Sequence, residues 1–258
     1  MSLITVEMDA RGVATVTLAR ADKHNALSAE MMTELEQAAR DLAKDRTVRV
    51  VVLAAEGKTF CAGGDLAWMR AQFDMDAETR KAESRRIATV LGALYDLPQP
   101  LIGRVQGNAL GGGVGLVSVC DVAIGVSGAK LGFTETRLGL IPANIGPYVL
   151  KRMGATRASE VFMSARVFDA DEAVRLNLLS RTVQPDALDT AIEAEIRPYL
   201  SCAPGAVAET KALMRDLAGR VTPAQVDMAI DALAMRWQSD EAREGVAAFF
   251  DKRAPGWQ

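Results

Sequence analysis

The sequence has 258 residues, a length that fits one large domain or a domain with a small appendage. Hydrophobic residues make up 49% and charged residues 24% of it, as in soluble globular proteins, and the formal net charge is -3. This balance argues against a general nucleic-acid-binding or membrane-surface protein, so any acidic ligand has to be met by local lysines and arginines.

The cysteines and the single histidine restrict the chemistry. Cys61, Cys120 and Cys202 lie far apart, form no CxxC pair and no zinc spacing, and their odd number suits a reducing compartment. Because His24 is the only histidine, we expect no Ser-His-Asp or Cys-His triad and no multi-histidine metal site. The sequence predicts a protein that needs neither a metal nor a cofactor.

No segment of the sequence has the pattern of an export signal or a membrane span. The first residues, MSLITVEMDARG, lack the apolar core of a secretory signal, and no run of 18 apolar residues occurs. We therefore predict a cytoplasmic protein with no membrane partner.

Strand and helix patterns alternate through the first half of the sequence. Residues Ile4–Met8 and Val13–Leu18 alternate in polarity like the two strands of a hairpin. Ser28 is placed to cap a helix over Ala29–Lys44, and the run Val48–Ala54 is typical of a buried strand. A helix, a strand, a short helix and a strand are then predicted at Ala77–Leu97, Leu101–Gln106, Gly113–Val119 and Asp121–Val126. This alternation predicts a right-handed α/β fold.

The last third is predicted to be mostly helical from Gly146 onward. Thr222 and Gln225 fit a capping box, with proline at the first helical position. The predicted helices are Leu188–Leu200, Ala206–Leu217 and Ala224–Gln238. We divide the chain into a core over residues 1–197 and a C-terminal helical module over residues 198–258.

Two glycine-rich turns, FCAGGDL at Phe60–Leu66 and GNALGGG at Gly107–Gly113, each follow a predicted strand. Glycine lets backbone N–H groups approach a ligand, and a helix start adds partial positive charge. If the turns face each other, the amides of Gly64 and Gly112 can form an oxyanion hole for a developing carbonyl charge. The alternative is that both turns serve folding alone. Neither turn matches GxGxxG or GxxxxGK[ST], which disfavours a nucleotide phosphate loop.

Five short motifs, taken in order and spacing, resemble the crotonase (enoyl-CoA hydratase/isomerase) superfamily. They are Asn-Ala-Leu-Ser at Asn25–Ser28, AG(A/G)D at Ala62–Asp65, GGG…CD at Gly111–Asp121, E-x-x-LG-x-x-P at Glu135–Pro142, and a tail at Glu244–Pro255. Each motif is weak alone, but their joint order is specific, and the resemblance covers essentially the whole chain.

This resemblance implies a spiral of repeated ββα units and a C-terminal helical region that assembles trimers or dimers of trimers. It implies an acyl-coenzyme A thioester as substrate, held by the Gly64 and Gly112 amides, with Glu135 moving a proton. Residues expected to border coenzyme A are Ala62, Gly63, Asp65, Leu66, Lys23, Phe249 and Lys252. The alternative for the two lysines is a solvated charge, and for Phe249 it is interface core.

One departure from the family pattern concerns the acid–base residues. Hydratases of this family usually carry a second glutamate two residues after the GGG triplet, where this sequence has Gly115. General acid–base groups contribute on the order of 10²–10⁴-fold, so the loss is substantial. Glu135 is then the expected lone acid–base residue; its alternative is a surface acid beside Arg137.

Three functions remain open from the sequence. Stretches at Asp65–Met69, Val114–Ile124, Glu135–Leu140 and Pro142–Tyr148 resemble bacterial methylglutaconyl-CoA hydratases of leucine and isoprenoid catabolism. This favours hydration of 3-methylglutaconyl-CoA. A single glutamate also suffices for an enoyl-CoA double-bond isomerase. The third function is a thioester hydrolase or a nearly inactive binder of coenzyme A thioesters.

A second carboxylate on the substrate would need a receiving group. Candidates by side-chain type are Arg70, Asn144, Tyr148 and Arg137. Asn144 is notable because the family more often has glycine there, although a turn role is the alternative.

RNA binding is an alternative of a different class and would need a basic stripe. The dense basic run is Arg80-Lys81 followed by Arg85-Arg86, interleaved with Glu78 and Glu83. Mixed charges on one predicted helix favour a solvated face, so no nucleic-acid partner is expected.

Overall fold

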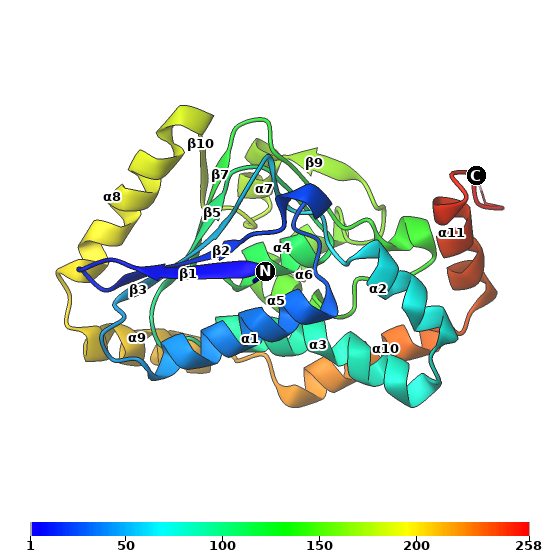
Figure 1. Ribbon diagram of the computed structural model, residues 1–258, viewed down its shortest axis with the longest axis horizontal. Helices are drawn as coiled ribbons and strands as arrows, with labels where there is room; N and C mark the ends of the chain where they lie inside the picture. The colour runs from blue at the N-terminus through cyan, green and yellow to red at the C-terminus, as the bar shows by residue number, and fades with distance from the viewer. Residues whose placement is uncertain (1, 258) are drawn as a thin grey trace.

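The computed structural model describes residues 2–257 and has two sheets connected by helices (Figure 1). The larger sheet has six strands in the order β1-β2-β3-β5-β7-β10. β1 and β2 form the predicted hairpin, and all other neighbouring pairs are parallel. The strands are β1 (Ile4–Met8), β2 (Val13–Leu18), β3 (Val50–Ala55), β5 (Leu101–Val105), β7 (Val122–Val126) and β10 (Arg181–Val183).

The smaller sheet has four strands of three residues each, in the order β4-β6-β8-β9. They are β4 (Thr59–Cys61), β6 (Asn108–Leu110), β8 (Lys130–Gly132) and β9 (Val167–Asp169). β4, β6 and β8 run parallel, whereas β9 is antiparallel to β8. Strands this short carry no readable alternation, which is why the sequence did not predict them. The chain after Gly146 is mostly helical, as predicted, with β9 and β10 as two short strands that the sequence did not predict.

The chain winds as a spiral in which each turn adds one strand to each sheet and then a helical segment. β3 and β4 lead to α2 (Leu66–Ala71) and α3 (Ala77–Tyr95), β5 and β6 lead to α4 (Gly112–Val119), and β7 and β8 lead to α5 (Gly146–Met153). The predicted α/β fold of repeated ββα units is confirmed.

The remaining helices follow the hairpin or form the last third of the chain. They are α1 (Ala29–Lys44), α6 (Ala155–Ser159), α7 (Ala170–Arg175), α8 (Leu188–Leu200), α9 (Pro204–Leu217), α10 (Pro223–Trp237) and α11 (Asp240–Phe250). The predicted caps are confirmed: Ser28 accepts from the Met31 N–H, and Thr222 and Gln225 form a capping box. α2 and α11 were not predicted. The predicted boundary between residues 197 and 198 falls inside α8, and the two-part division stays a prediction.

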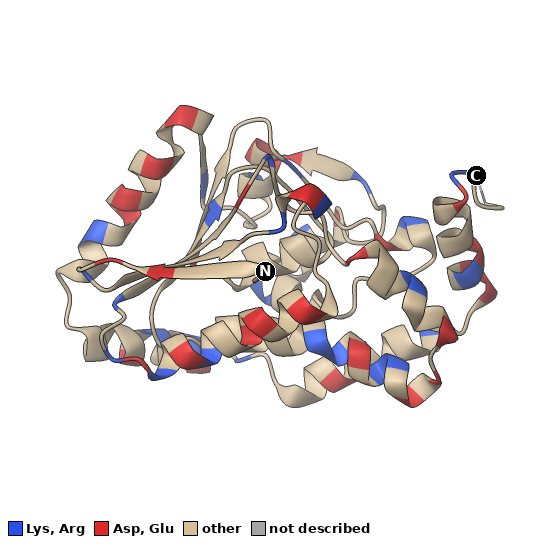
Figure 2. Cartoon of the chain, in the orientation of Figure 1, with Lys and Arg blue, Asp and Glu red and all other residues tan. Residues whose placement is uncertain are grey.

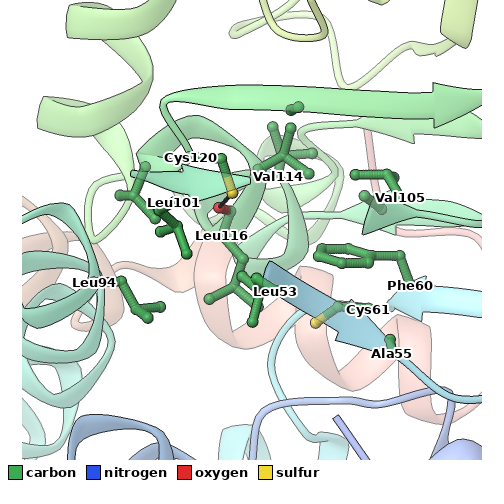
Figure 3. Packing of buried hydrophobic residues seen from close by; sticks show 14 of the residues in the cluster. Leu53, Ala55, Phe60, Cys61, Leu94, Leu101, Val105, Val114, Leu116 and Cys120 are labelled. Atoms are coloured by element: carbon green, nitrogen blue, oxygen red, sulfur yellow. Dashed lines mark hydrogen bonds between the residues drawn. The ribbon is translucent and has the colours of Figure 1, made fainter. Parts of the chain in front are cut away.

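Helices cover both faces of the larger sheet (Figure 1). α8 packs on β3, β5 and β7, while α1 and α3 lie side by side on the other side. α4 is buried along its whole length, as expected for a helix that is apolar all round. Figure 3 shows its Leu116 beside Leu53 of β3, and Val114 and Leu101 of β5 belong to the same main core. This packing fixes the start of α4, where the second glycine turn lies.

Buried charges attach α9 to the core. Lys211 Nζ lies 2.5 Å from Asp121 Oδ2 and donates to the Gln99 carbonyl at 2.7 Å. Arg215 contacts the other Asp121 oxygen at 3.1 Å and stacks over the ring of Tyr95. Burial lowers the pKa of Lys211, partly opposed by Asp121. One aspartate therefore neutralises two cations where the last third joins the sheet.

α11 packs directly against the turn that carries Glu135. A Cβ at Gly245 would lie 2.5 Å from the carbonyl oxygen of Leu138, so only glycine permits this approach. Arg236, near the end of α10, donates to the Gly139 carbonyl at 2.6 Å. The C-terminal helices thus support the predicted acid–base residue from behind. Within residues 2–257, no helix has the length and apolar character that crossing a membrane requires.

Candidate active site

The predicted catalytic groups converge at the carboxyl ends of three neighbouring strands. The chain passes from β4 into Gly63 and Gly64, from β6 into Gly111 and Gly112, and from β8 to Glu135. Because β4, β6 and β8 are parallel and adjacent, their carboxyl ends meet at one edge of the smaller sheet.

The first glycine turn is held by hydrogen bonds that leave the Gly64 amide free. Leu27 pairs with Gly64 as an isolated parallel bridge, in which the Leu27 N–H donates to the Gly63 carbonyl at 2.8 Å. The Asp65 N–H donates to the Leu27 carbonyl at 3.0 Å. A parallel bridge of this kind uses only the flanking residues, so among residues 2–257 the Gly64 N–H has no backbone acceptor.

The second turn also presents an amide, that of Gly112, with no backbone acceptor in the described part of the chain. Gly111 has φ 49°, and its N–H donates to the Gly132 carbonyl of β8 at 2.9 Å. Gly112 is the first residue of α4, where an N–H has no intrahelical acceptor. The turns touch: a Cβ on Gly63 would lie 3.6 Å from the Gly112 nitrogen. Two free N–H groups at facing turns can polarise one carbonyl oxygen.

The Asn25–Ser28 motif and Asp65 hold the first turn in place. Asn25 is fully buried, accepts from the Arg20 N–H at 3.0 Å, and donates to the carbonyls of Glu56 and Thr59. Asp65 caps α2 and pairs with Arg20 at 2.7 Å. The Arg20 partner and the cap bonds lower the pKa of Asp65 against the effect of its burial.

Glu135 is the acid of the site: the residue is partly exposed, but its Oε2 is buried. The residue opens η3 (Glu135–Leu138), and its Oε1 lies 3.0 Å from where a Cβ on Gly111 would stand. Among residues 2–257, its buried Oε2 has no hydrogen-bond partner. Burial raises the pKa of Glu135 to about 7, against the lowering effect of the backbone N–H groups of Thr134 and Glu135. The alternative of a surface acid paired with Arg137 is wrong, because Arg137 instead donates to the Ala165 carbonyl at 3.1 Å.

A cavity of about 420 Å³ lies in front of these groups. Its wall includes both glycine turns, Glu135, the loop before α5 and the C-terminal helices. Lining residues to which the sequence assigned no individual role are Trp68, Met69, Ser84, Ile87, Leu110, Thr134, Leu140, Ile141, Ile145, Leu233, Trp237, Arg253 and Pro255. Most of them are apolar, and their spacing along the chain carries no signal because they come from α2, α3, β6, α10, the segment between β8 and α5, and the residues after α11.

The position of the missing glutamate is filled by another side chain. A Cβ at Gly115 would lie 2.6 Å from Ile145 Cγ2 and 3.1 Å from Leu91 Cδ1. Gly115 does not line the cavity. The loss of the family's first acid therefore leaves no empty space for an extra water molecule; the packed Ile145 occupies it.

The residues predicted to border coenzyme A separate into two groups. Ala62, Gly63, Leu66, Phe249 and Asn144 line the cavity, and Phe249 is 48% exposed. The side chains of Lys23, Lys252 and Asp65 do not line it; both lysines are exposed, whereas Asp65 is buried in its cap and ion pair. Contact of any of these residues with coenzyme A stays a prediction.

The candidates for a second substrate carboxylate also separate. Asn144 lines the cavity, and Arg137 lines it as an exposed side chain. Arg70 lies over the Phe250 ring at 5.6 Å, and the Tyr148 hydroxyl donates to the Ala88 carbonyl at 3.3 Å, outside the lining. Asn144 is thus the candidate within the apolar part of the wall.

The basic run on α3 is engaged within the chain. Lys81 pairs with Asp231 at 2.5 Å, Arg85 with Asp227 at 2.6 Å, and Arg86 with Glu83 at 2.8 Å. Figure 2 shows positive and negative segments mixed along α3. The run attaches α10 to α3, and this arrangement gives no support to the RNA-binding alternative.

A spiral of ββα units that presents two free amides and one buried carboxyl in a single cavity defines the crotonase class of proteins. The chain belongs to the enoyl-CoA hydratase/isomerase family, whose sequence profile matches residues 9–258. The resemblance stated from the motifs is confirmed. The protein is therefore an enoyl-CoA hydratase-type enzyme whose substrates are acyl-coenzyme A thioesters.

Individual relatives cover nearly the whole chain. Mouse mitochondrial methylglutaconyl-CoA hydratase is 31% identical over 98% of this chain and 82% of its own length. Crotonyl-CoA hydratase of Syntrophomonas wolfei is 31% identical over 93% of this chain and 92% of its own. The crystal structure of an enoyl-CoA hydratase from Mycobacterium avium is 32% identical, superposes with a TM-score of 0.88 and covers 100% of both chains.

Proposed function

We propose that this enzyme adds water reversibly to a 2-enoyl-CoA thioester, with 3-methylglutaconyl-CoA as its substrate. The observation that carries the proposal is a carboxyl group with a pKa of about 7 in the same cavity as two unpaired backbone amides. A pKa near neutrality lets one group accept a proton in one step and return it in the next.

The chemistry follows from this arrangement. The thioester oxygen accepts hydrogen bonds from the Gly64 and Gly112 N–H groups. The Glu135 carboxylate takes a proton from a water molecule. At the same time the oxygen of this water molecule forms a bond to C3, and the C2–C3 double bond opens. The resulting enolate charge rests on the thioester oxygen, where the two amides stabilise it. Glu135 then delivers the same proton to C2, which completes the addition of one water molecule.

The choice of 3-methylglutaconyl-CoA rests on resemblance. The methylglutaconyl-CoA hydratase relative and the glycine at position 115 support it. Coenzyme A is part of the substrate, so the reaction as written needs no cofactor and no metal. In this proposal the coenzyme A moiety lies along residues 62–66 and Phe249, with Lys23 and Lys252 as phosphate contacts.

The assembly and the compartment are part of the same proposal. Trimers, or dimers of trimers, are supported by large apolar side chains left exposed on α9 and α10. These are Leu213, Met214, Leu217, Met228 and Met235. A cytoplasmic location is supported by an odd number of widely spaced cysteines, of which Cys61 and Cys120 are buried as free thiols.

Double-bond isomerisation is the second candidate. The packing of Ile145 against Gly115 favours it, because isomerisation moves one proton between two carbons and needs no water molecule. Both reactions use the same amides and the same glutamate, so only the products formed from each substrate can distinguish hydration from isomerisation.

An assay of purified protein with 3-methylglutaconyl-CoA, crotonyl-CoA and a 3-enoyl-CoA tests the proposal. We expect hydration, with the highest kcat/KM on 3-methylglutaconyl-CoA. Glu135→Gln should reduce kcat on the order of 10²–10⁴-fold while thioester binding stays within about threefold. Preference for crotonyl-CoA would reject the substrate, conversion of the 3-enoyl-CoA alone would favour the isomerase, and full activity of Glu135→Gln would reject the mechanism.

A further inference from the structure

Two buried oxygens in the cavity wall lack a partner. Among residues 2–257, the lining residues with a buried, unpaired side-chain oxygen are Glu135, through Oε2, and Asn144, through Oδ1. Leaving such an atom unpaired costs about 1–3 kcal/mol, so these positions are unfavourable for the empty protein. The wall around them is largely apolar, and both residues belong to the segment between β8 and α5.

Asn144 lines the cavity, and the nitrogen of its amide is the accessible end of the side chain. Its Nδ2 makes no hydrogen bond within residues 2–257 and is not among the buried atoms. Since Oδ1 is buried, Nδ2 is the end that a bound molecule can reach. An amide keeps its protons at neutral pH, so Asn144 can hold an oxygen atom but cannot exchange a proton with it.

The position of Asn144 next to Ile145 places it near the start of α4. It precedes Ile145, whose side chain packs against Gly115. Gly115 lies three residues after Gly112 on α4, which is about 4.5 Å along the helix axis. The Asn144–Ile145 peptide therefore lies beside the part of α4 that directly follows the Gly112 amide, in the same cavity wall as Glu135.

We propose that Asn144 holds the attacking water molecule at C3 and so replaces the positioning role, though not the proton transfer, of the absent glutamate. This inference rests on the proposed hydration. The Nδ2 group donates a hydrogen bond to the water oxygen, and the water donates one proton to Glu135. The water oxygen keeps a lone pair for the bond to C3, and Asn144 is unchanged at the end of the cycle.

The test separates water placement from proton transfer at C2. Hydration of the preferred enoyl-CoA needs the amides, Glu135 and a placed water molecule. Exchange of the C2 proton of butyryl-CoA in D₂O needs only the amides and Glu135, because the saturated chain accepts no water. Asn144→Leu keeps the side-chain size without a donor, and Asn144→Ala is a second variant in case the first misfolds. Gln37→Leu removes an exposed amide on α1 as the matched control.

We expect both Asn144 variants to lose on the order of 10²-fold in hydration kcat, with KM and the butyryl-CoA exchange rate within about threefold of wild type. The apparent pKa of the hydration pH profile should not move. Gln37→Leu should match wild type in both reactions.

Three outcomes would overturn the inference. Equal loss of hydration and exchange would assign Asn144 to the placement of Glu135 or the thioester. A rise in KM confined to 3-methylglutaconyl-CoA, with normal hydration of crotonyl-CoA, would assign it to the distal carboxylate. Unchanged hydration would remove it from the reaction. If the proposed hydratase function is wrong, the wild-type protein will exchange the C2 proton of butyryl-CoA but hydrate no enoyl-CoA. This result is distinguishable from a failure of the Asn144 inference, which appears only in the Asn144 variants.

Discussion

The burial of the Glu135 carboxyl group lowers the free energy of unfolding at neutral pH. Its pKa rises from an ordinary value of 4.5 to about 7 because burial disfavours the charged carboxylate. At pH below about 4.5 the group is protonated in both the folded and the unfolded chain. Between about 4.5 and about 7 the unfolded chain loses the proton while the folded protein keeps it, so the free energy of unfolding falls as pH rises.

Glu135→Gln should therefore be more stable than wild type at pH 8. The two pKa values differ by about 2.5 pH units, which at about 1.4 kcal/mol per unit gives a gain of up to about 3–4 kcal/mol. The gain should vanish near pH 4. Urea unfolding of both proteins at pH 4, 6 and 8 measures it, and a difference that is constant with pH would contradict the role of burial.

The side chain of Ile145 prevents a larger residue from replacing Gly115, because it occupies the space that a side chain at position 115 would need. Gly115→Glu should lose at least about 1–3 kcal/mol of stability without raising hydration, because its Cβ would overlap Ile145 Cγ2 at 2.6 Å. The double variant with Ile145→Ala should lose less than the two single variants together. A thermodynamic cycle from urea unfolding measures the coupling, and strict additivity of the two effects would show that the positions do not compete for space.

At the scale of elements, α9 depends on one partly buried aspartate, Asp121, which pairs with the buried Lys211 and Arg215. Asp121→Ala should lower the free energy of unfolding by about 3 kcal/mol or more, since it leaves Lys211 and Arg215 without their shared counter-charge. Asp231→Ala is the matched control: its ion pair with Lys81 is more exposed, so the loss should stay within about 1 kcal/mol. Chemical denaturation measures both, and equal losses would refute a special role of burial.

The glycine turns also belong to this scale. Three of the four short strands of the smaller sheet, β4, β6 and β8, each lead into a segment with one predicted catalytic group, and their parallel pairing brings the three segments to one edge. The bridge of Leu27 to Gly64 explains why the Asn25–Ser28 motif, distant from the turns in sequence, belongs to the same site. The motif holds the turn; it does not enter the lining of the cavity.

At the scale of the whole molecule, the C-terminal helices should mediate assembly. Leu213 is 58% exposed and Leu217 is 81% exposed, four residues apart on one side of α9. We expect a mass near 83 kDa, three times 27.6 kDa, or a multiple of it. The double variant Leu213→Glu with Leu217→Glu should shift the protein toward monomer in analytical ultracentrifugation. Val6→Glu, at an exposed apolar position on β1, should not, and a monomeric wild type would reject the assembly.

Much of the architecture could be predicted from the sequence. Long periodic segments and their caps, such as the helix that begins after Ser28 and the buried strand β3, were correctly placed because local sequence largely determines them. α2 and the strands of the smaller sheet were missed. They have three to six residues, and their existence depends on pairing with partners distant in sequence.

The sequence by itself determined the family, the two glycine turns and the identity of Glu135, because these are fixed by residue type and order. Only the tertiary structure decided that the Gly64 and Gly112 amides have no backbone acceptor within residues 2–257, that Glu135 shares their cavity with a pKa of about 7, and that Ile145 fills the space beside Gly115. The physical reason is that burial and hydrogen-bond partnership belong to groups far apart along the chain, which only the folded spiral brings into contact.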